Sequence, residues 1–449
     1  MRPIVTVMLC TAVAIAAVAG CDSSTTPEAD VAACKQATPD NQIPLPIFPG
    51  SDRVDLDAPS FSNPASVTNP LFPIAQLHSA ILLGTVDGLP FRTETTLLNY
   101  VETINLGDEE IDVLVSQYMA LIDGRIEEVA LDWYGQAGDG SVWYFGEDVF
   151  NYENGLLADT DGTWVTCEDG PAAMIMPDNP QVGDVYRPEN AYPIVFEEVV
   201  VKAVGQTVNG PSGPVSGAIV VEELHMDGTK EDKTFAPGYG EFFTGSGGDV
   251  EAIALAVPTD ALAGPPPNSL VTVLDGAYSV FDAAHAQDWS AATATLSSMN
   301  TAWNSYQAGG VPPMLETQMD DALVALGAAI TAADPTAARH AALDVAIAAS
   351  DFELRYRPRV EIDYIRLDLW ARRLQVDTEA NDVAGIASDV TILEWVWDRL
   401  APPAEESAAI GAAIARARAG VARTDHVAVR RAAVDIRRGV DTRAEGVNE

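Results

Sequence analysis

The stretch AGPPPNS, residues 263–269, separates two halves of the chain that have different residue patterns. Three consecutive prolines fit neither a continuing strand nor a helix interior, so they predict a linker. Short apolar or alternating runs broken by turn signals precede it, and apolar residues at a period of 3.6 follow it. The sequence therefore predicts an α+β protein of two domains. An antiparallel curved β-sheet or open barrel is expected over residues 67–262, and an all-α bundle of about eight helices, built from helix hairpins, over residues 270–449.

Turn dipeptides such as Asp87-Gly88, Asp123-Gly124 and Asn154-Gly155 recur through the first half. They favour the positive φ angles of tight hairpins and predict an antiparallel meander. The clearest expected strands are HSAILLGTV (78–86), DVLVSQYMALI (112–122), SVWYFGED (141–148) and GAIVVEELHM (217–226). The segment DEEIDVLVSQYMALI also permits a helix packed on the sheet, so both alternatives stay open for it.

A weak repeat organises the second half of the chain. Each copy has an Asp or Asn followed three residues later by alanine, as expected for an N-cap and the closely packed start of a helix. The four copies are QDWSAAT (287–293), ADPTAAR (333–339), ANDVAGI (380–386) and TDHVAVR (424–430), with expected caps Asp288, Asp334, Asn381 and Asp425. Because each cap follows another amphipathic run, the sequence predicts four helix hairpins.

The N-terminus predicts export and lipid attachment. Residues 1–20 resemble a signal peptide, because Arg2 precedes an apolar run that is too short to span a bilayer. Val18-Ala19-Gly20-Cys21 resembles the lipobox of bacterial lipoproteins, in which the cysteine receives diacylglycerol. We expect Cys21 to anchor the protein in the bacterial cell envelope, at the outer membrane or the outer face of the plasma membrane. An ordinary signal peptide with a chance cysteine is the alternative. Residues 21–66 are expected to form a disordered tether.

The cysteines predict one disulfide. Cys10 lies in the signal and Cys21 is assigned to the lipid, which leaves Cys34 and Cys167. Two thiols in an oxidising compartment most simply pair with each other. A reactive thiol is the alternative, and no neighbouring residue in the sequence supports it.

Composition and motifs narrow the classes of function. The chain has 25 basic and 66 acidic residues and a formal net charge of −41. Such a surface repels polyanions, so nucleic acid is not an expected partner. The sequence contains no GxxxxGK[ST], GxGxxG, GxSxG or HExxH pattern. We therefore predict no catalytic residues, no metal and no cofactor, and an enzyme is the least favoured class.

Two acidic loops resemble parts of a calcium site. Asp159 and Asp161 precede Gly162, and Asp139 occupies a similar loop. A full calcium loop needs further oxygen ligands and a bidentate glutamate in register, for which Glu168 is the nearby candidate. Ordinary hairpin turns are the favoured interpretation.

Two sets of residues are candidates for a ligand or partner surface. The first is the aromatic set Trp133, Trp143 and Tyr144, one face of which could line a cavity, although core packing on both faces is the favoured alternative. The second surrounds a predicted central helix, where charged groups must be paired or used. It comprises Arg355, Arg357, Arg359, Asp363 and Asp368, and an internal structural network is its favoured alternative.

Four segments carry a family resemblance: NPLFPI (69–74), DWYGQAGDGSVWYFGED (132–148), MPDNPQVGDVYR (176–187) and FAPGYGEFF (235–243). They resemble, in the same order, segments of uncharacterised bacterial secreted proteins and lipoproteins. The resemblance covers the β half and implies a curved sheet or open barrel, similar to lipoprotein carriers that hold apolar ligands. It implies no catalytic residues.

Together these observations predict a lipid-anchored envelope protein with a non-catalytic binding or interaction role, whose sheet holds an apolar ligand or a polypeptide. A scaffolding lipoprotein without a small ligand is the first alternative. A hydrolase with a dispersed carboxylate site is the second.

Overall fold

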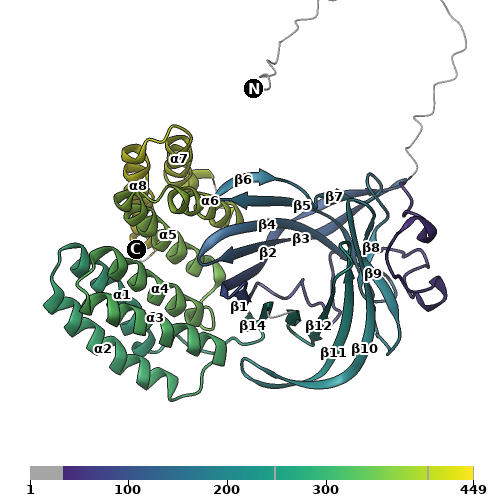
Figure 1. Ribbon diagram of the computed structural model, residues 1–449, viewed down its shortest axis with the longest axis horizontal. Coiled ribbons are helices and arrows are strands. Elements are labelled where there is room, and N and C mark those ends of the chain that lie inside the picture. The colour runs from purple at the N-terminus through teal and green to yellow at the C-terminus, as the bar shows by residue number, and fades with distance from the viewer. Residues whose placement is uncertain (1–33, 247–248, 402–403, 448–449) are drawn as a thin grey trace, which may run out of the picture.

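The computed structural model describes residues 34–246, 249–401 and 404–447, which form a curved sheet followed by a group of helices (Figure 1). The sheet has 14 strands and is antiparallel and unclosed. Its strand order is β6-β5-β4-β3-β2-β1-β14-β13-β12-β11-β10-β9, and β7 and β8 both pair with β5. The predicted α+β architecture is therefore confirmed.

The strands follow a meander on each side of the central β1–β14 pair. Their bounds are β1 Ser79–Val86, β2 Leu89–Leu106, β3 Glu109–Ile122, β4 Arg125–Gln136, β5 Val142–Glu153, β6 Leu156–Asp159, β7 Trp164–Val165, β8 Ala173–Met176, β9 Val185–Ala191, β10 Val195–Gly210, β11 Gly213–His225, β12 Lys230–Ala236, β13 Gly240–Ser246 and β14 Asp249–Val257. The chain thus returns its last strand beside its first.

Tight hairpins form at the dipeptides that predicted them. Asp87-Gly88, Asp123-Gly124 and Asn154-Gly155 join β1 to β2, β3 to β4 and β5 to β6. Both residues of each pair have positive φ, from 49° to 76°. This is the conformation of a two-residue turn whose twist matches that of the flanking strands.

The helical alternative for residues 108–122 is wrong, because this segment is strand β3. Its near-continuous apolar character arises because the sheet is covered on both faces. Met119 and Leu121 pack against the helices, while Tyr118, which precedes Met119, turns to the inner face. Period-2 alternation is hidden where both faces of a strand are buried.

The described residues form eight α-helices after the linker, in agreement with the prediction. They are α1 Asn268–His285, α2 Trp289–Gln307, α3 Pro313–Thr331, α4 Pro335–Glu353, α5 Arg359–Ala380, α6 Val383–Leu400, α7 Ala404–Ala422 and α8 His426–Val447. Helices α1 to α5 share a core with Ile81 and Leu255 of the sheet, and α5 to α8 share another with β3 and β4. No helix among those described is long and apolar enough to cross a membrane.

Three of the four predicted helix caps are confirmed. The carboxylates of Asp288, Asp334 and Asp425 accept hydrogen bonds from backbone N–H groups at the starts of α2, α4 and α8. The prediction for Asn381 is wrong by one residue. Asn381 ends α5 with φ of 59°, and the side chain of Asp382 caps α6 instead. Asn tolerates this left-handed conformation and so serves as a C-cap.

The segment expected as a tether packs on the sheet from Cys34 onward. Cys34 forms the predicted disulfide with Cys167. Asp40 pairs with buried Arg187 at 2.9 Å, and Ile43 is buried. A few anchoring contacts thus order a segment whose polar, proline-rich composition resembles a spacer. Residues 1–33, which include Cys21, lie outside the described residues.

A buried group of ion pairs joins the sheet to the helices. Glu94 of β2 accepts hydrogen bonds from Arg366 of α5 and Arg399 of α6 at 3.1 and 3.0 Å. Arg92 of β2 reaches Asp351 of α4 at 2.7 Å. Because adjacent strand residues face opposite sides, Arg92 and Glu94 meet the helices while Thr93 faces the inner side. The two domains therefore share a charged interface.

Candidate ligand cavity in the curved sheet

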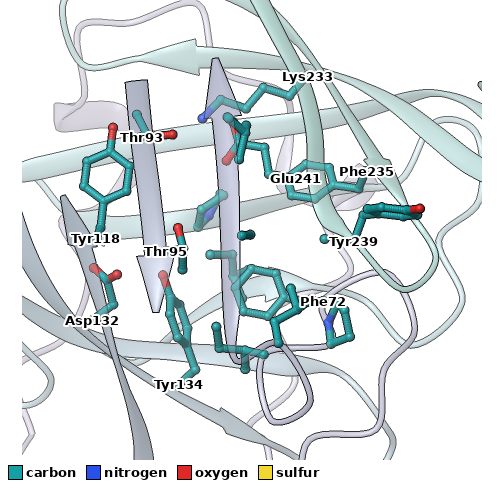
Figure 2. A pocket seen from close by; sticks show the side chains of 18 of the residues that line it. Phe72, Thr93, Thr95, Tyr118, Asp132, Tyr134, Lys233, Phe235, Tyr239 and Glu241 are labelled. Atoms are coloured by element: carbon teal, nitrogen blue, oxygen red, sulfur yellow. The ribbon is translucent and has the colours of Figure 1, made fainter. Parts of the chain in front are cut away.

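A cavity of about 180 Å³ lies on the inner face of the sheet (Figure 2). Strands from both meanders line it, including Thr93 and Thr95 of β2, Tyr118 of β3 and Lys233 of β12. The segment that precedes β1 lines it as well, with Phe72 among its side chains. The curvature of the sheet and this inserted segment together make the enclosure.

One part of the lining is apolar and aromatic. The aliphatic and phenylalanine side chains come from the segment before β1 and from strands β1, β8, β10 and β12: Phe72, Ile74, Leu77, Ala80, Leu82, Ile175, Val199 and Phe235. Four tyrosines, Tyr118, Tyr134, Tyr186 and Tyr239, add both ring faces and hydroxyl groups. The hydroxyl of Tyr186 is buried and has no hydrogen-bond partner among the described residues. A buried hydroxyl without a partner is unfavourable unless something else in the site contacts it.

The other part of the lining is acidic. Five carboxyl groups line the cavity: Asp132 of β4, Glu197 of β10, Glu223 of β11, Glu241 of β13 and Glu251 of β14. Lys233 is the one lysine or arginine among the lining residues. The lining therefore carries an excess of negative charge whenever more than one carboxyl is ionised.

Two of these carboxylates have cationic partners. The ammonium of Lys233 lies 2.7 Å from Glu223 Oε2, and His225 Nδ1 lies 3.1 Å from Glu197 Oε1. Burial opposes the charge of Lys233, but Glu223, Glu241 and Glu197 outweigh it and raise the lysine's pKa well above its usual value. Burial likewise opposes the ionised form of Glu197, but His225 and Lys233 lower its pKa to about 2. This corner of the cavity is charged at neutral pH.

Asp132 and Glu251 form no ion pair with a described residue, although the charge of Lys233 acts on Glu251 from a greater distance. Burial raises the pKa of Asp132 to about 7, although the Tyr144 hydroxyl and Ser116 Oγ donate hydrogen bonds to it at 2.8 and 3.1 Å. Burial and the nearby Glu241 raise the pKa of Glu251 to about 7, against a hydrogen bond from Thr93 Oγ1 at 3.1 Å. Both groups are poised to lose a proton near neutral pH.

The five lining carboxyl groups, called here the acidic wall, have two further carboxyl neighbours outside the lining, Glu147 and Glu189. Burial and the charge of Asp132 raise the pKa of Glu147 well above its usual value, and burial and Glu197 do the same for Glu189. Burial and Glu197 raise the pKa of Glu223 to about 7 despite Lys233. Such a group of carboxyls can hold and exchange protons at neutral pH.

The paired corner also has a donor set that suits a metal ion. Three residues each offer one ligand atom: Glu197, Glu223 and His225. These three atoms lie within 4.8 Å of one another. Two carboxylates and an imidazole match the preferences of Zn²⁺. The ammonium of Lys233 already contacts Glu223, so a metal ion would have to displace it. No metal is expected from the sequence, and these three residues are the ones that could hold one.

The predicted aromatic candidates lie in the core beside the cavity. Trp133, Trp143 and Tyr144 are all buried in the same apolar cluster of the sheet. Trp143 Nε1 donates to Ser141 Oγ at 2.8 Å. Tyr144 contributes indirectly, by donating to Asp132 and by stacking on Tyr134 at 4.7 Å between ring centroids.

The predicted charged candidates do not gather into one site. Arg355 Nε donates to the backbone oxygen of Asp260 at 3.2 Å, and Arg357 pairs with Glu353 at 2.8 Å. Arg359 pairs with Asp363, which also pairs with Arg399 and Arg366. Asp368 pairs with Arg372 and Arg437 at 2.6 and 3.0 Å. These side chains hold helices together and lie outside the cavity lining.

The acidic loops form hydrogen bonds typical of turns. Asp139 accepts from the backbone N–H of Ser141 at 3.0 Å, and Asp159 accepts from that of Asp161 at 3.1 Å. Each carboxylate thus accepts a hydrogen bond from the backbone of its own turn.

The sequence analysis missed the cavity carboxylates. A signal for them exists in strands such as VVEELHM, where two acidic residues interrupt an apolar run. Lysine is scarce in the chain, and Lys233 is one of its few lysines. Neither signal indicates which face of a strand is inner.

Comparison with protein-family models, with curated proteins and with solved structures finds no match for this chain.

Proposed function

We propose that this protein is a lipid-anchored, extracytoplasmic binding protein of the bacterial cell envelope, whose β domain holds a small ligand in the cavity. The observation that supports it is the amphipathic cavity itself, whose lining combines apolar and aromatic side chains with five carboxyl groups. Enclosed pockets with a mostly apolar lining and a few convergent polar groups are the usual form of small-molecule sites. Attachment through Cys21 and the residue 1–20 signal remain predictions from the sequence.

The unpartnered hydroxyl of Tyr186 supports occupancy of the cavity. A core filled only for stability would place an apolar side chain or a hydrogen-bond partner at that position. A bound molecule would supply the missing partner. The polar groups of the lining then orient the ligand while the apolar wall supplies most of the affinity.

Native mass spectrometry of the full chain, extracted gently from its own envelope, tests this proposal. We expect the native mass to exceed the denatured mass, which already includes the covalent lipid, by the mass of one ligand. Thr95→Phe should fill the cavity and abolish that excess, whereas Thr103→Phe, at an exposed position of the same strand, should retain it. An unliganded native protein that also binds no small molecule would favour the scaffolding alternative.

A hydrolase is the second candidate, and one observation favours it. Asp132 lines the cavity with its pKa raised to about 7 by burial, and its charge helps burial to raise the pKa of the neighbouring Glu147. A carboxyl that is half-protonated at neutral pH can act as a general acid or base. Conversion of the co-purified ligand by fresh protein, lost in Asp132→Asn, would favour this function over simple binding.

A further inference from the structure

We propose that the ligand of the cavity is a small organic cation: an ammonium group carried on an apolar or aromatic body. This inference rests on the proposed binding function and adds the chemical class of the ligand. It comes from the balance of charges, the aromatic lining and the size of the cavity.

The charges of the lining leave part of the acidic wall without a cation. Lys233 contacts Glu223, and His225 contacts Glu197. No described residue forms an ion pair with Asp132, Glu241 or Glu251. Their hydrogen bonds come from hydroxyl groups: Tyr144 and Ser116 for Asp132, Thr244 for Glu241 and Thr93 for Glu251. The charge of Lys233 acts on Glu241 and Glu251 without forming an ion pair with either. Buried carboxylates are normally paired, so the missing positive charge is the feature that a ligand would supply.

The aromatic side chains suit the same kind of group. Tyr118, Tyr134 and Tyr186 line the cavity together with the carboxyls, and Figure 2 shows Tyr118, Tyr134 and Asp132 side by side. Ring faces attract ammonium groups, and aromatic cages are a common means of binding them. The free hydroxyl of Tyr186 can accept a hydrogen bond from an ammonium N–H. An anionic ligand would face the same wall with repulsion.

The volume of the cavity limits the size of the ligand's carbon skeleton. The cavity holds about 180 Å³. An engineered cavity of roughly 150 Å³ in another protein accommodates benzene. A phenyl ring with a short aminoalkyl arm, or an alkylamine of similar size, therefore fits, with its carbon skeleton against Phe72, Leu77 and Phe235 and its ammonium toward Glu251 or Asp132.

Calorimetry with three probes of nearly equal shape tests the inference: benzylamine, benzyl alcohol and benzoate. The sample is the full chain in detergent, shown by native mass spectrometry to be free of ligand. We expect benzylamine to bind at pH 8 at least about tenfold more tightly than benzyl alcohol, and benzoate to bind least, because hydrogen bonds to charged groups are the stronger ones. Any compound that co-purifies and must be removed should itself carry an amine.

Two glutamine variants locate the effect. Glu251→Gln should weaken benzylamine about tenfold while leaving benzyl alcohol unchanged. Glu222→Gln is the matched control, because Glu222 lies outside the cavity, paired with Lys202 and Lys230, and should change neither affinity. Unchanged binding of benzyl alcohol shows that both variants fold with the cavity intact.

The outcomes separate the two proposals. If benzyl alcohol binds as tightly as benzylamine, or if the co-purified compound is neutral or anionic, the cation inference is overturned and the binding function stands. If the ligand-free protein binds none of the three probes and no compound co-purifies, the binding function fails as well. Equal loss of benzylamine affinity in both glutamine variants would also overturn the inference, because Glu222 does not face the cavity.

Discussion

Replacing Arg399 by methionine should weaken the protein strongly, because this guanidinium connects the two domains through buried contacts. Its side chain is 0% exposed. Nε and Nη2 donate to Asp363 Oδ1 at 3.1 and 2.6 Å, and Nη1 donates to Glu94 Oε2 at 3.0 Å. Arg399→Met keeps the aliphatic stem but leaves two buried carboxylates with one cation fewer.

The expected loss in the free energy of unfolding depends on which cations remain beside Glu94 and Asp363 after the substitution. Removing one partner of a buried ion pair costs roughly 3–5 kcal/mol, because the remaining charge is left in a poorly solvated site. Glu94 keeps Arg92 and Arg366, and Asp363 keeps Arg359 together with a longer contact to Arg366. We therefore expect a loss near the lower end, about 3 kcal/mol in the free energy of unfolding. The guanidinium also bridges β2 and α6, so the two domains should unfold less cooperatively in the variant.

Urea denaturation followed by far-UV circular dichroism measures the loss, and hydrogen exchange reports separately on the strands and the helices. Arg416→Met is the matched control, because Arg416 pairs with Asp435 on the surface with 54% of its side chain exposed. Exposed pairs contribute about 0–1 kcal/mol. If Arg399→Met were no less stable than Arg416→Met, the ion pairs at the domain interface would contribute no net stability, and the reasoning would be refuted.

Three further predictions concern the cavity and the disulfide. Benzylamine affinity should fall about tenfold between pH 8 and pH 6, because Glu251, whose pKa is about 7, is protonated at the lower pH; calorimetry showing a constant affinity would contradict this. Asp132→Asn should raise the melting temperature more at pH 8 than at pH 5. The folded-state pKa of Asp132, about 7, exceeds its ordinary 3.8, so ionisation progressively destabilises the folded protein as the pH rises through that window. Cys34→Ser should lower the free energy of unfolding by about 2–5 kcal/mol, and reduction of the wild-type Cys34–Cys167 disulfide should cause the same loss in a denaturation curve.

Local signals in the sequence were sufficient for most of the fold. Asp-Gly and Asn-Gly pairs locate hairpins because their backbone preference acts within two residues. Aspartate caps locate helix starts for the same reason, since the carboxylate bonds to N–H groups two or three residues ahead. The one misplaced helix cap, at Asn381, arose where two polar residues with different capping roles are adjacent. Asn381 closes one helix and Asp382 opens the next.

The cavity could not be predicted in this way, because its features depend on long-range pairing. Glu223 and Glu251 line the same cavity only because β11 and β14 belong to the same curved sheet. The ordering of residues 34–66 is similar, since it depends on partners such as Arg187 and Cys167 far along the chain. Composition describes a segment's average preference, and a few specific contacts can override it.

The acidic wall has a consequence for stability that connects the cavity to its occupant. Carboxyl groups whose pKa lies near 7, such as Asp132 and Glu251, destabilise the empty folded protein at neutral pH relative to ordinary surface carboxyls. A structural core would gain by replacing them with apolar side chains of similar size. A bound cation would reverse this effect, because it favours the ionised carboxylates and binds only the folded chain. Stabilisation by benzylamine should therefore be larger at pH 8 than at pH 6, whereas a neutral ligand would stabilise the protein equally at both.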